Sequence, residues 1–154
     1  MEENYAVKFW GVRGSYPAPG TNTVRYGGNT SCVEVRLGGE SIILDAGTGI
    51  IPLGQELARR AIQGRKALKV TLLLSHLHHD HTQGFPFFVP AYMPTAHVQI
   101  FGHAPSNQSL ARVLESNQSP QTFPIGLSDM AAPEILDIVQ VLTKHEVIET
   151  PNPV

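Results

Sequence analysis

The chain of 154 residues lacks several features that would assign a protein to a class at once. It contains a single cysteine, Cys32, so no disulfide can form within the chain and nothing requires an oxidising compartment. No apolar run approaches the roughly 18 residues that a membrane-spanning helix needs. The N-terminus begins with acidic residues and lacks the apolar stretch of a signal peptide. We therefore expect a cytoplasmic protein without a membrane partner.

An excess of charge of either sign is also missing. Lys and Arg number 11 against 13 Asp and Glu, which gives a formal net charge of −2. Such a balance exerts no general attraction on anionic polymers, so nucleic acid is not an expected partner. Gly (14) and Pro (12) are plentiful and clustered, which favours short strands and tight loops over a helical bundle. The length fits one domain, residues 1–154, with a core of its own.

Apolar patterning predicts an alternation of strands and helix in the first part of the chain. Gly38-Gly39 separates two strand patterns and favours a hairpin. Ile50, Leu53, Leu57 and Ala61 have helical spacing, and Gly64 should end that helix. A strand, helix, strand succession predicts a right-handed crossover and an α/β fold. The expected strands are 5–12, 31–37, 41–45, 68–74 and 98–101.

The remaining segments give weaker patterns. We expect one or two helical turns over 82–88 and a short helix over 109–115. Strands are expected over 135–142 and 146–148, and the proline-containing end, 150–154, should be frayed.

The chemistry is concentrated in Ser75-His76-Leu77-His78-His79-Asp80-His81. Five of these seven residues can ligate a metal ion, and four of the chain's seven histidines are among them. His76 and His78 can point to the same side of an extended segment, whereas Asp80 and His81 lie where the chain turns toward a helix. Two adjacent ligand pairs indicate a site for two divalent metal ions. Zinc is the first choice for imidazole and carboxylate ligands, with manganese and iron as alternatives. The competing interpretation is a solvated histidine-rich turn.

His76-x-His78-x-Asp80-His81 after an apolar strand resembles the signature of the metallo-β-lactamase superfamily. Leu44-Asp45-Ala46-Gly47-Thr48-Gly49 is similar to the aspartate-glycine motif that precedes it in that fold. The openings Phe9-Trp10-Gly11-Val12-Arg13-Gly14-Ser15 and Tyr26-Gly27-Gly28-Asn29-Thr30-Ser31 resemble the branch that contains phosphoribosyl cyclic phosphodiesterases. The resemblance extends from about residue 5 to residue 101. It implies an αββα sandwich, a mixed sheet with flanking helices in each half.

The resemblance also implies roles for individual residues. His76 and His78 would bind the first metal ion, and Asp80 and His81 the second. A metal-activated water would attack a phosphate ester, and Asp80 would be catalytic by orienting that water. Asp45 would support the histidine loop from behind. Arg13 would approach a substrate phosphate, because its planar fork matches phosphate oxygens; the alternative is a surface or ion-paired arginine of the loop.

Members of the family supply further ligands, two histidines and a bridging aspartate, from a second half. Here only His97, His103 and His145 follow the motif, with Asp129 and Asp137 as the late aspartates, and none has the context of a distal ligand. We therefore expect the N-terminal half of the sandwich, truncated on its C-terminal side. Its inner sheet face, expected to carry Val33, Val35, Ile43, Leu72 and Leu74, would associate with a second copy or a complementing chain.

Two functional hypotheses follow. The first is a metal-dependent hydrolase, most simply a phosphodiesterase acting on a small cyclic or nucleotide-like phosphate ester. The second is a non-catalytic metal-binding or assembly subunit, a split or truncated half of such an enzyme. The missing distal ligands distinguish them, since fold alone does not choose a reaction.

Overall fold

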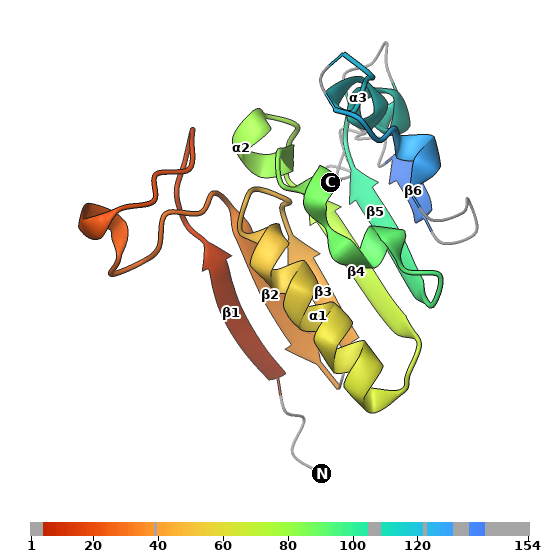
Figure 1. The fold of residues 1–154 in the computed structure, drawn as a ribbon, viewed down its shortest axis with the longest axis horizontal. Helices are drawn as coiled ribbons and strands as arrows, with labels where there is room; N and C mark the ends of the chain where they lie inside the picture. The colour runs from red at the N-terminus through yellow and green to blue at the C-terminus, as the bar shows by residue number, and fades with distance from the viewer. Residues whose placement is uncertain (1–4, 39, 105–108, 122, 131–135, 141–154) are drawn as a thin grey trace, which may run out of the picture.

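The computed structural model of the chain is built around a single mixed sheet (Figure 1). It describes residues 5–38, 40–104, 109–121 and 123–130, and the backbone of 136–140. Six strands lie side by side in the order in which they occur in the sequence. They are β1 (Tyr5–Gly11), β2 (Cys32–Leu37), β3 (Glu40–Leu44), β4 (Leu68–Leu74), β5 (Ala96–Gly102) and β6 (Leu136–Gln140).

The direction of each strand follows from its connection. The β2–β3 pair is antiparallel, as expected for the hairpin at Gly38, whose φ of +56° is a left-handed conformation that glycine adopts freely. β1 is antiparallel to β2, whereas β3, β4, β5 and β6 run parallel to one another. The strand predicted over 135–142 is thus present as β6, whereas 146–148 and the tail at 150–154 lie outside the described residues.

One long helix, α1 (Ile50–Gly64), connects β3 to β4 and covers one face of the sheet (Figure 1). Its buried positions Ile50, Leu53 and Leu57 recur at helical spacing and match the sequence prediction. They pack against Ile43, Leu72 and Ile100, which are fully buried on the same face of the sheet. Helix α1 and the sheet thus form the core without help from a second molecule.

The helical structure after the histidine motif differs from the prediction. Instead of one helical stretch over 82–88, a single turn, α2 (His79–Thr82), begins inside the motif. It is followed by two 3₁₀ turns, η2 (Phe85–Phe87) and η3 (Val89–Tyr92). Pro86 and Pro90, the second residues of the two turns, favour the start of new helical turns and prevent the earlier one from continuing. The helix predicted over 109–115 is present as α3 (Leu110–Asn117). Two more 3₁₀ turns lie in loops, η1 (Thr21–Thr23) and η4 (Leu127–Asp129).

The opposite face of the sheet is open across β1 to β4, and its residues differ from the expected inner face. Ile43, Leu72 and Leu74 are buried against the helices, whereas Val33 and Val35 lie on the open face and are only partly buried. Between the two valines, Glu34 points into the core with no exposed surface. The prediction was therefore right for Val33 and Val35 and wrong for Ile43, Leu72 and Leu74, because the register aligns Ile43 and Leu72 with Glu34 on the helix-covered face.

The open face is strongly apolar. Its register aligns Phe9 with Val33, Val33 with Leu44, Leu44 with Leu73 and Leu73 with Phe101 across five strands. Phe9 is 66% exposed and Val7 is 51% exposed. In the part of the chain that the structure describes, no helix has the length and apolar character required to cross a membrane.

Candidate metal centre

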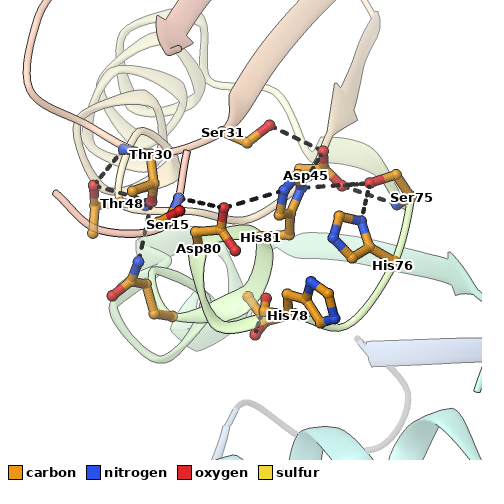
Figure 2. A network of polar contacts seen from close by, with 12 residues as sticks. Ser15, Thr30, Ser31, Asp45, Thr48, Ser75, His76, His78, Asp80 and His81 are labelled. Carbon is orange, nitrogen blue, oxygen red and sulfur yellow. Dashed lines mark hydrogen bonds and ion pairs between the residues drawn. The ribbon is translucent and has the colours of Figure 1, made fainter. Parts of the chain in front are cut away.

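The sheet topology brings four loops together at one end of the strands. Because β3 and β4 are parallel, Asp45 and Ser75 emerge at the same end of the sheet. Because β2 is antiparallel to β3, its beginning at Ser31 lies at that end too. The loop after β1 also starts there, and Figure 2 shows Ser15, Ser31, Asp45, Ser75 and the histidine motif gathered together.

Asp45 is the centre of this arrangement. Its Oδ1 accepts the backbone N–H of Ser75 at 2.9 Å and the hydroxyl of Ser75 at 2.7 Å. Its Oδ2 accepts the hydroxyl of Ser31 at 3.0 Å and lies 2.8 Å from Nδ1 of His81. Burial alone would raise the pKa of Asp45, but these hydrogen bonds outweigh it and hold the pKa below its usual value. The carboxylate is therefore an anion that orients its neighbours.

The hydrogen bonds of Asp45 determine which ring nitrogens remain available for a ligand. Nδ1 of His81 donates to the Asp45 carboxylate, which leaves its Nε2 as an acceptor. The Ser75 hydroxyl has one proton and donates it to Asp45, so at 3.0 Å it accepts from Nδ1 of His76. Nε2 of His76 is then also left as an acceptor. Both rings thus present the nitrogen that a metal ion would need.

The predicted ligands lie close to one another. The His76 ring centroid is 4.5 Å from that of His78 and 4.0 Å from that of His81. Asp80 places Oδ2 at 3.5 Å from Nε2 of His81. The same Asp80 oxygen accepts the backbone N–H of Ser15 at 2.8 Å, and this bond lowers the pKa of the Asp80 carboxyl despite opposing desolvation. Asp80 is therefore ionised at neutral pH.

These donors suit a divalent transition metal in kind, because imidazole nitrogen and carboxylate oxygen are its usual protein ligands. Their positions, however, do not give a complete set of ligands for a single metal ion. Within the described part of the chain, no three His, Cys, Asp or Glu side chains converge so that they could hold one ion. The structure thus brings His76, His78, Asp80 and His81 close together without forming a complete ligand set among the described residues.

Two glycines allow the loops to approach one another this closely. A Cβ on Gly47 would lie 2.3 Å from the Asp80 carbonyl oxygen, and a Cβ on Gly84 would lie 2.2 Å from the Gly47 carbonyl oxygen. Backbone bonds from Ala46 to the His81 carbonyl and from Gly84 to the Ala46 carbonyl join the same segments. The glycines on either side of the motif are thus required for packing the aspartate loop against the histidine loop.

Further polar side chains, which were not among the predicted site residues, form hydrogen bonds that hold these loops together. Thr30 and Thr48 exchange hydrogen bonds, and the amide of Gln83 donates to the Thr30 hydroxyl at 3.2 Å. With Ser15, Ser31 and Ser75, these residues were not predicted to have a role. Ser75 adjoins the motif and Ser31 begins a strand at the same sheet edge, which is the signal that could have identified them.

Arg13 was predicted to contact a substrate phosphate. Arg13 lies two residues before Ser15, with its guanidinium carbon 5.5 Å from the Tyr16 ring centroid. No carboxylate pairs with Arg13 in the described residues, so the predicted ion pair on the loop surface is not found there.

The residues considered as distal ligands lie at different places in the fold. Asp129 accepts the backbone N–H of Gly126 and so stabilises its own turn. His97 is the second residue of β5, at the end of the sheet opposite the motif, whereas His103 follows β5 at the end where Ser75 emerges, because Leu74 pairs with Gly102. His145 and the side chain of Asp137 lie outside the described residues.

Comparisons with known proteins agree with this geometry. The family model of the metallo-beta-lactamase superfamily matches residues 25–152. None of the curated proteins matches the chain at a significant level.

Two solved structures have a similar fold. The metallo-beta-lactamase fold protein YhfI from Bacillus subtilis is 16% identical with a TM-score of 0.50, and the match covers 92% of this chain and 46% of YhfI. A diphosphatase from the PhnP family is 16% identical with a TM-score of 0.52, and the match covers 90% of this chain and 51% of the diphosphatase. The chain thus spans about half the length of each. The family match covers most of the sequence and includes the whole histidine motif, so this chain belongs to the metallo-beta-lactamase superfamily.

Proposed function

We propose that this chain provides the metal-binding half of a phosphodiesterase that uses two divalent metal ions, zinc in the first place and manganese or iron as alternatives. One observation carries the proposal. Asp45 and Ser75 fix the Nδ1 side of His81 and of His76, which leaves both Nε2 atoms as acceptors, and that of His81 lies 3.5 Å from Oδ2 of Asp80. Preorganised imidazoles of this kind are typical of a metal centre and unusual in a solvated turn.

The residues divide into two ligand pairs. His76 and His78 would hold one ion, and Asp80 and His81 the other. Such ions, when bound, lower the pKa of water toward neutrality and polarise phosphoryl oxygens. Asp80 adds a carboxylate that is ionised at neutral pH and is held in place by the Ser15 N–H. It is suited to orient an attacking water and to accept its proton.

A small cyclic or nucleotide-like phosphate ester is the proposed substrate class. The resemblance of the opening loops to phosphodiesterases supports it, and one of the similar structures is a diphosphatase. The missing ligands are proposed to come from a second sheet layer that packs on the open face and is not among the described residues. A second function, a non-catalytic metal-binding subunit, is favoured by one observation, namely that no three ligands converge in the part of the chain that the structure describes.

Hydrolysis of bis(p-nitrophenyl) phosphate after loading with zinc, manganese or iron tests the proposal. We expect Asp80→Asn to lower turnover by at least about 100-fold, because the amide neither takes a proton nor binds a hard cation as a carboxylate does. Asp129→Asn is the matched control, since this carboxylate only accepts a hydrogen bond within its own turn. Near-native turnover of Asp80→Asn would show that this loop is not the catalytic centre. Absence of turnover in the wild-type chain with all three metals would favour the non-catalytic subunit.

A further inference from the structure

A projecting loop, residues 12–29, stands beside the candidate metal centre (Figure 1). We call it the arm. It leaves the sheet after β1 and returns at the start of β2, and hydrogen bonds hold its base closed, from the N–H groups of Val12 and Arg13 to the Asn29 carbonyl. Its middle is braced as well, because Ala18 N–H donates to the Gly28 carbonyl and the Thr23 hydroxyl donates to the Ala18 carbonyl. Hydrogen bonds within the arm therefore give it a defined structure of its own.

The arm is connected to the metal centre at one point. The backbone N–H of Ser15 donates to Oδ2 of Asp80 at 2.8 Å, across 65 residues of sequence. Ser15 has a φ of +69°, a left-handed conformation that is rare for a non-glycine residue and is characteristic of functional sites. This bond places the arm next to the carboxylate that would orient the attacking water.

The charge of the arm is of one sign. Residues 12–29 contain Arg13 and Arg25 and no acidic residue, in a chain whose formal net charge is −2. No carboxylate pairs with either arginine in the part of the chain that the structure describes. The Nε–H of Arg13 is buried and has no acceptor there, although buried donors are normally satisfied. Two unneutralised guanidinium groups favour an anion with several oxygens, such as a phosphate.

Aromatic rings accompany the two arginines. The guanidinium carbon of Arg25 lies 5.1 Å from the Tyr26 ring centroid, and that of Arg13 lies 5.5 Å from the Tyr16 centroid. Tyr26 is 72% exposed and Tyr16 is 63% exposed, so most of each ring is accessible to a ligand. Arginine and tyrosine side by side form the combination that binds phosphate and stacks on a nucleobase in sequence-independent recognition.

A cavity joins these groups. Its volume is about 230 Å³, and Arg13, Arg25, Tyr26 and Asn22 are among the residues that line it. It is smaller than the 300–1,000 Å³ of a typical pocket for a drug-sized ligand, so it would hold a fragment of a substrate rather than a polymer. The Asn22 side chain adds a neutral hydrogen-bonding group beside the two cations.

We propose that the arm binds a nucleoside phosphate, with a non-scissile phosphate between Arg13 and Arg25 and the base stacked on Tyr26. This rests on the proposed function, because it assigns the nucleotide part of the substrate to the arm and the scissile phosphate to the metal centre. The sequence alone pointed only to Arg13. The structure adds Arg25, Tyr26 and the cavity that they share.

Calorimetric titration of the full chain with adenosine 5′-monophosphate tests the proposal. The protein is first stripped of metal with EDTA, so that binding by the arm is measured whether or not the chain is a hydrolase. We expect the monophosphate to bind more tightly than adenosine or inorganic phosphate. Arg25→Ala and Tyr26→Ala should each weaken binding at least about fivefold, the low end of the loss of one charge-assisted or stacking contact. Tyr26→Phe should retain binding, because the ring is kept.

Arg59→Ala on α1 and Tyr5→Ala are the matched controls, since both replace exposed residues outside the arm and Tyr5 lies at the end of β1 opposite the arm. They should leave the affinity unchanged. Failure of the monophosphate to bind at millimolar concentration would overturn the proposal. So would inorganic phosphate that binds as tightly as the nucleotide, or affinities that Arg25→Ala and Tyr26→Ala lower no more than the controls do. A chain that binds the nucleotide and hydrolyses nothing would contradict the proposed function and leave the arm's role in nucleotide binding supported.

Discussion

At the scale of residues, Asp45 combines three properties that the histidine motif depends on. Its φ of +63° is in the left-handed region, which lets the chain turn sharply after β3. Its carboxylate is an anion buried to 7% exposure, and it accepts from Ser31, Ser75 and His81. Asparagine and aspartate are the non-glycine residues that tolerate left-handed backbone best. The backbone role and the charge of this residue can therefore be separated by substitution.

We expect Asp45→Asn to keep the fold and to lower metal affinity by roughly 10–100-fold, the usual effect of losing a hydrogen-bonded partner behind a histidine ligand. The physical reason is that a neutral amide no longer favours the His81 tautomer whose Nε2 faces outward. Competition with a chelator, with zinc measured by elemental analysis, gives the affinity. Asp129→Asn serves as the control. An affinity equal to that of the wild-type chain would mean that Asp45 only shapes the turn.

The candidate metal ligands could be picked out from the sequence, but the residues that support them could not. Histidine at short spacing beside aspartate has few explanations other than a metal site, so His76, His78, Asp80 and His81 stood out. Serine and threonine are common in loops and carry no such signal by themselves. The roles of Ser15, Ser31 and Ser75 arise only when the sheet brings their loops to one edge.

At the scale of elements, α1 is fixed to the sheet by a buried charge as well as by apolar packing. Glu34 of β2 has no exposed surface and accepts from Arg60 of α1 at 2.7 Å, Ser41 at 3.1 Å and the Trp10 indole at 3.0 Å. Burial would raise the pKa of Glu34, but the hydrogen bonds from Arg60 and Trp10 outweigh it and lower the pKa. A fully satisfied group of this kind specifies how the helix sits on the strand.

The lowered pKa of Glu34 predicts a pH dependence of stability. A carboxyl whose pKa is depressed on folding stabilises the protein above its unfolded value of about 4.3, and this contribution disappears as the pH falls through the lower folded value. We expect Glu34→Gln to be less stable than the wild type at neutral pH and the difference to shrink below about pH 4. Urea denaturation at several pH values, followed by fluorescence of Trp10, measures it. Glu40→Gln on the exposed start of β3 is the control. A difference that stays constant from pH 7 to pH 3 would contradict the role assigned to Glu34.

Helices and strands were predicted well where the local sequence pattern determines them. They were predicted poorly where a contact with a residue distant in the sequence determines them. The strands expected over 5–12, 31–37, 41–45, 68–74 and 98–101, the Gly38 hairpin and α1 follow from apolar spacing and turn residues, and these are present. Ile43, Leu72 and Leu74 were expected on the open face, but they share the helix-covered face with Glu34, whose partner Arg60 is 26 residues away. The turn α2 starts at His79, inside a segment whose residues had been interpreted as ligands alone.

At the scale of the whole molecule, one face of the sheet is covered and the other is open. The covered face packs against α1 and forms a buried core. The other carries a continuous apolar row from Phe9 through Val33 and Leu44 to Leu73, directly below the edge that bears the metal motif. Exposed apolar surface of this extent marks an interface in a water-soluble protein. The chain spans about half the length of each of the two similar structures.

We propose that the occupant of this face is a second β-sheet with an apolar surface of its own. Two sheets that pack face to face interdigitate their side chains at about 10 Å separation, which would remove both surfaces from water. The row ends beneath the histidine loop, so a layer placed there could also bring ligands to the open side of His76 and His78. This arrangement would complete the two ligand pairs that the described residues leave incomplete.

Without that layer, the same face should associate with itself. We expect residues 1–154 to have a mass above the 16.8 kDa of one chain at tens of micromolar, measured by light scattering after gel filtration. The double variant Phe9→Lys, Leu44→Lys should be monomeric, because each change places a charge that would have to lose its water in the interface. Both side chains are exposed, by 66% and 39%, so the helix-covered core is not disturbed. Ile62→Lys is the control, because it makes the same kind of change on α1, away from the open face, where the side chain is 71% exposed. This variant should associate like the wild type. A wild-type chain that stays monomeric, or an Ile62→Lys variant that dissociates as the double variant does, would show that the open face is not the surface that associates.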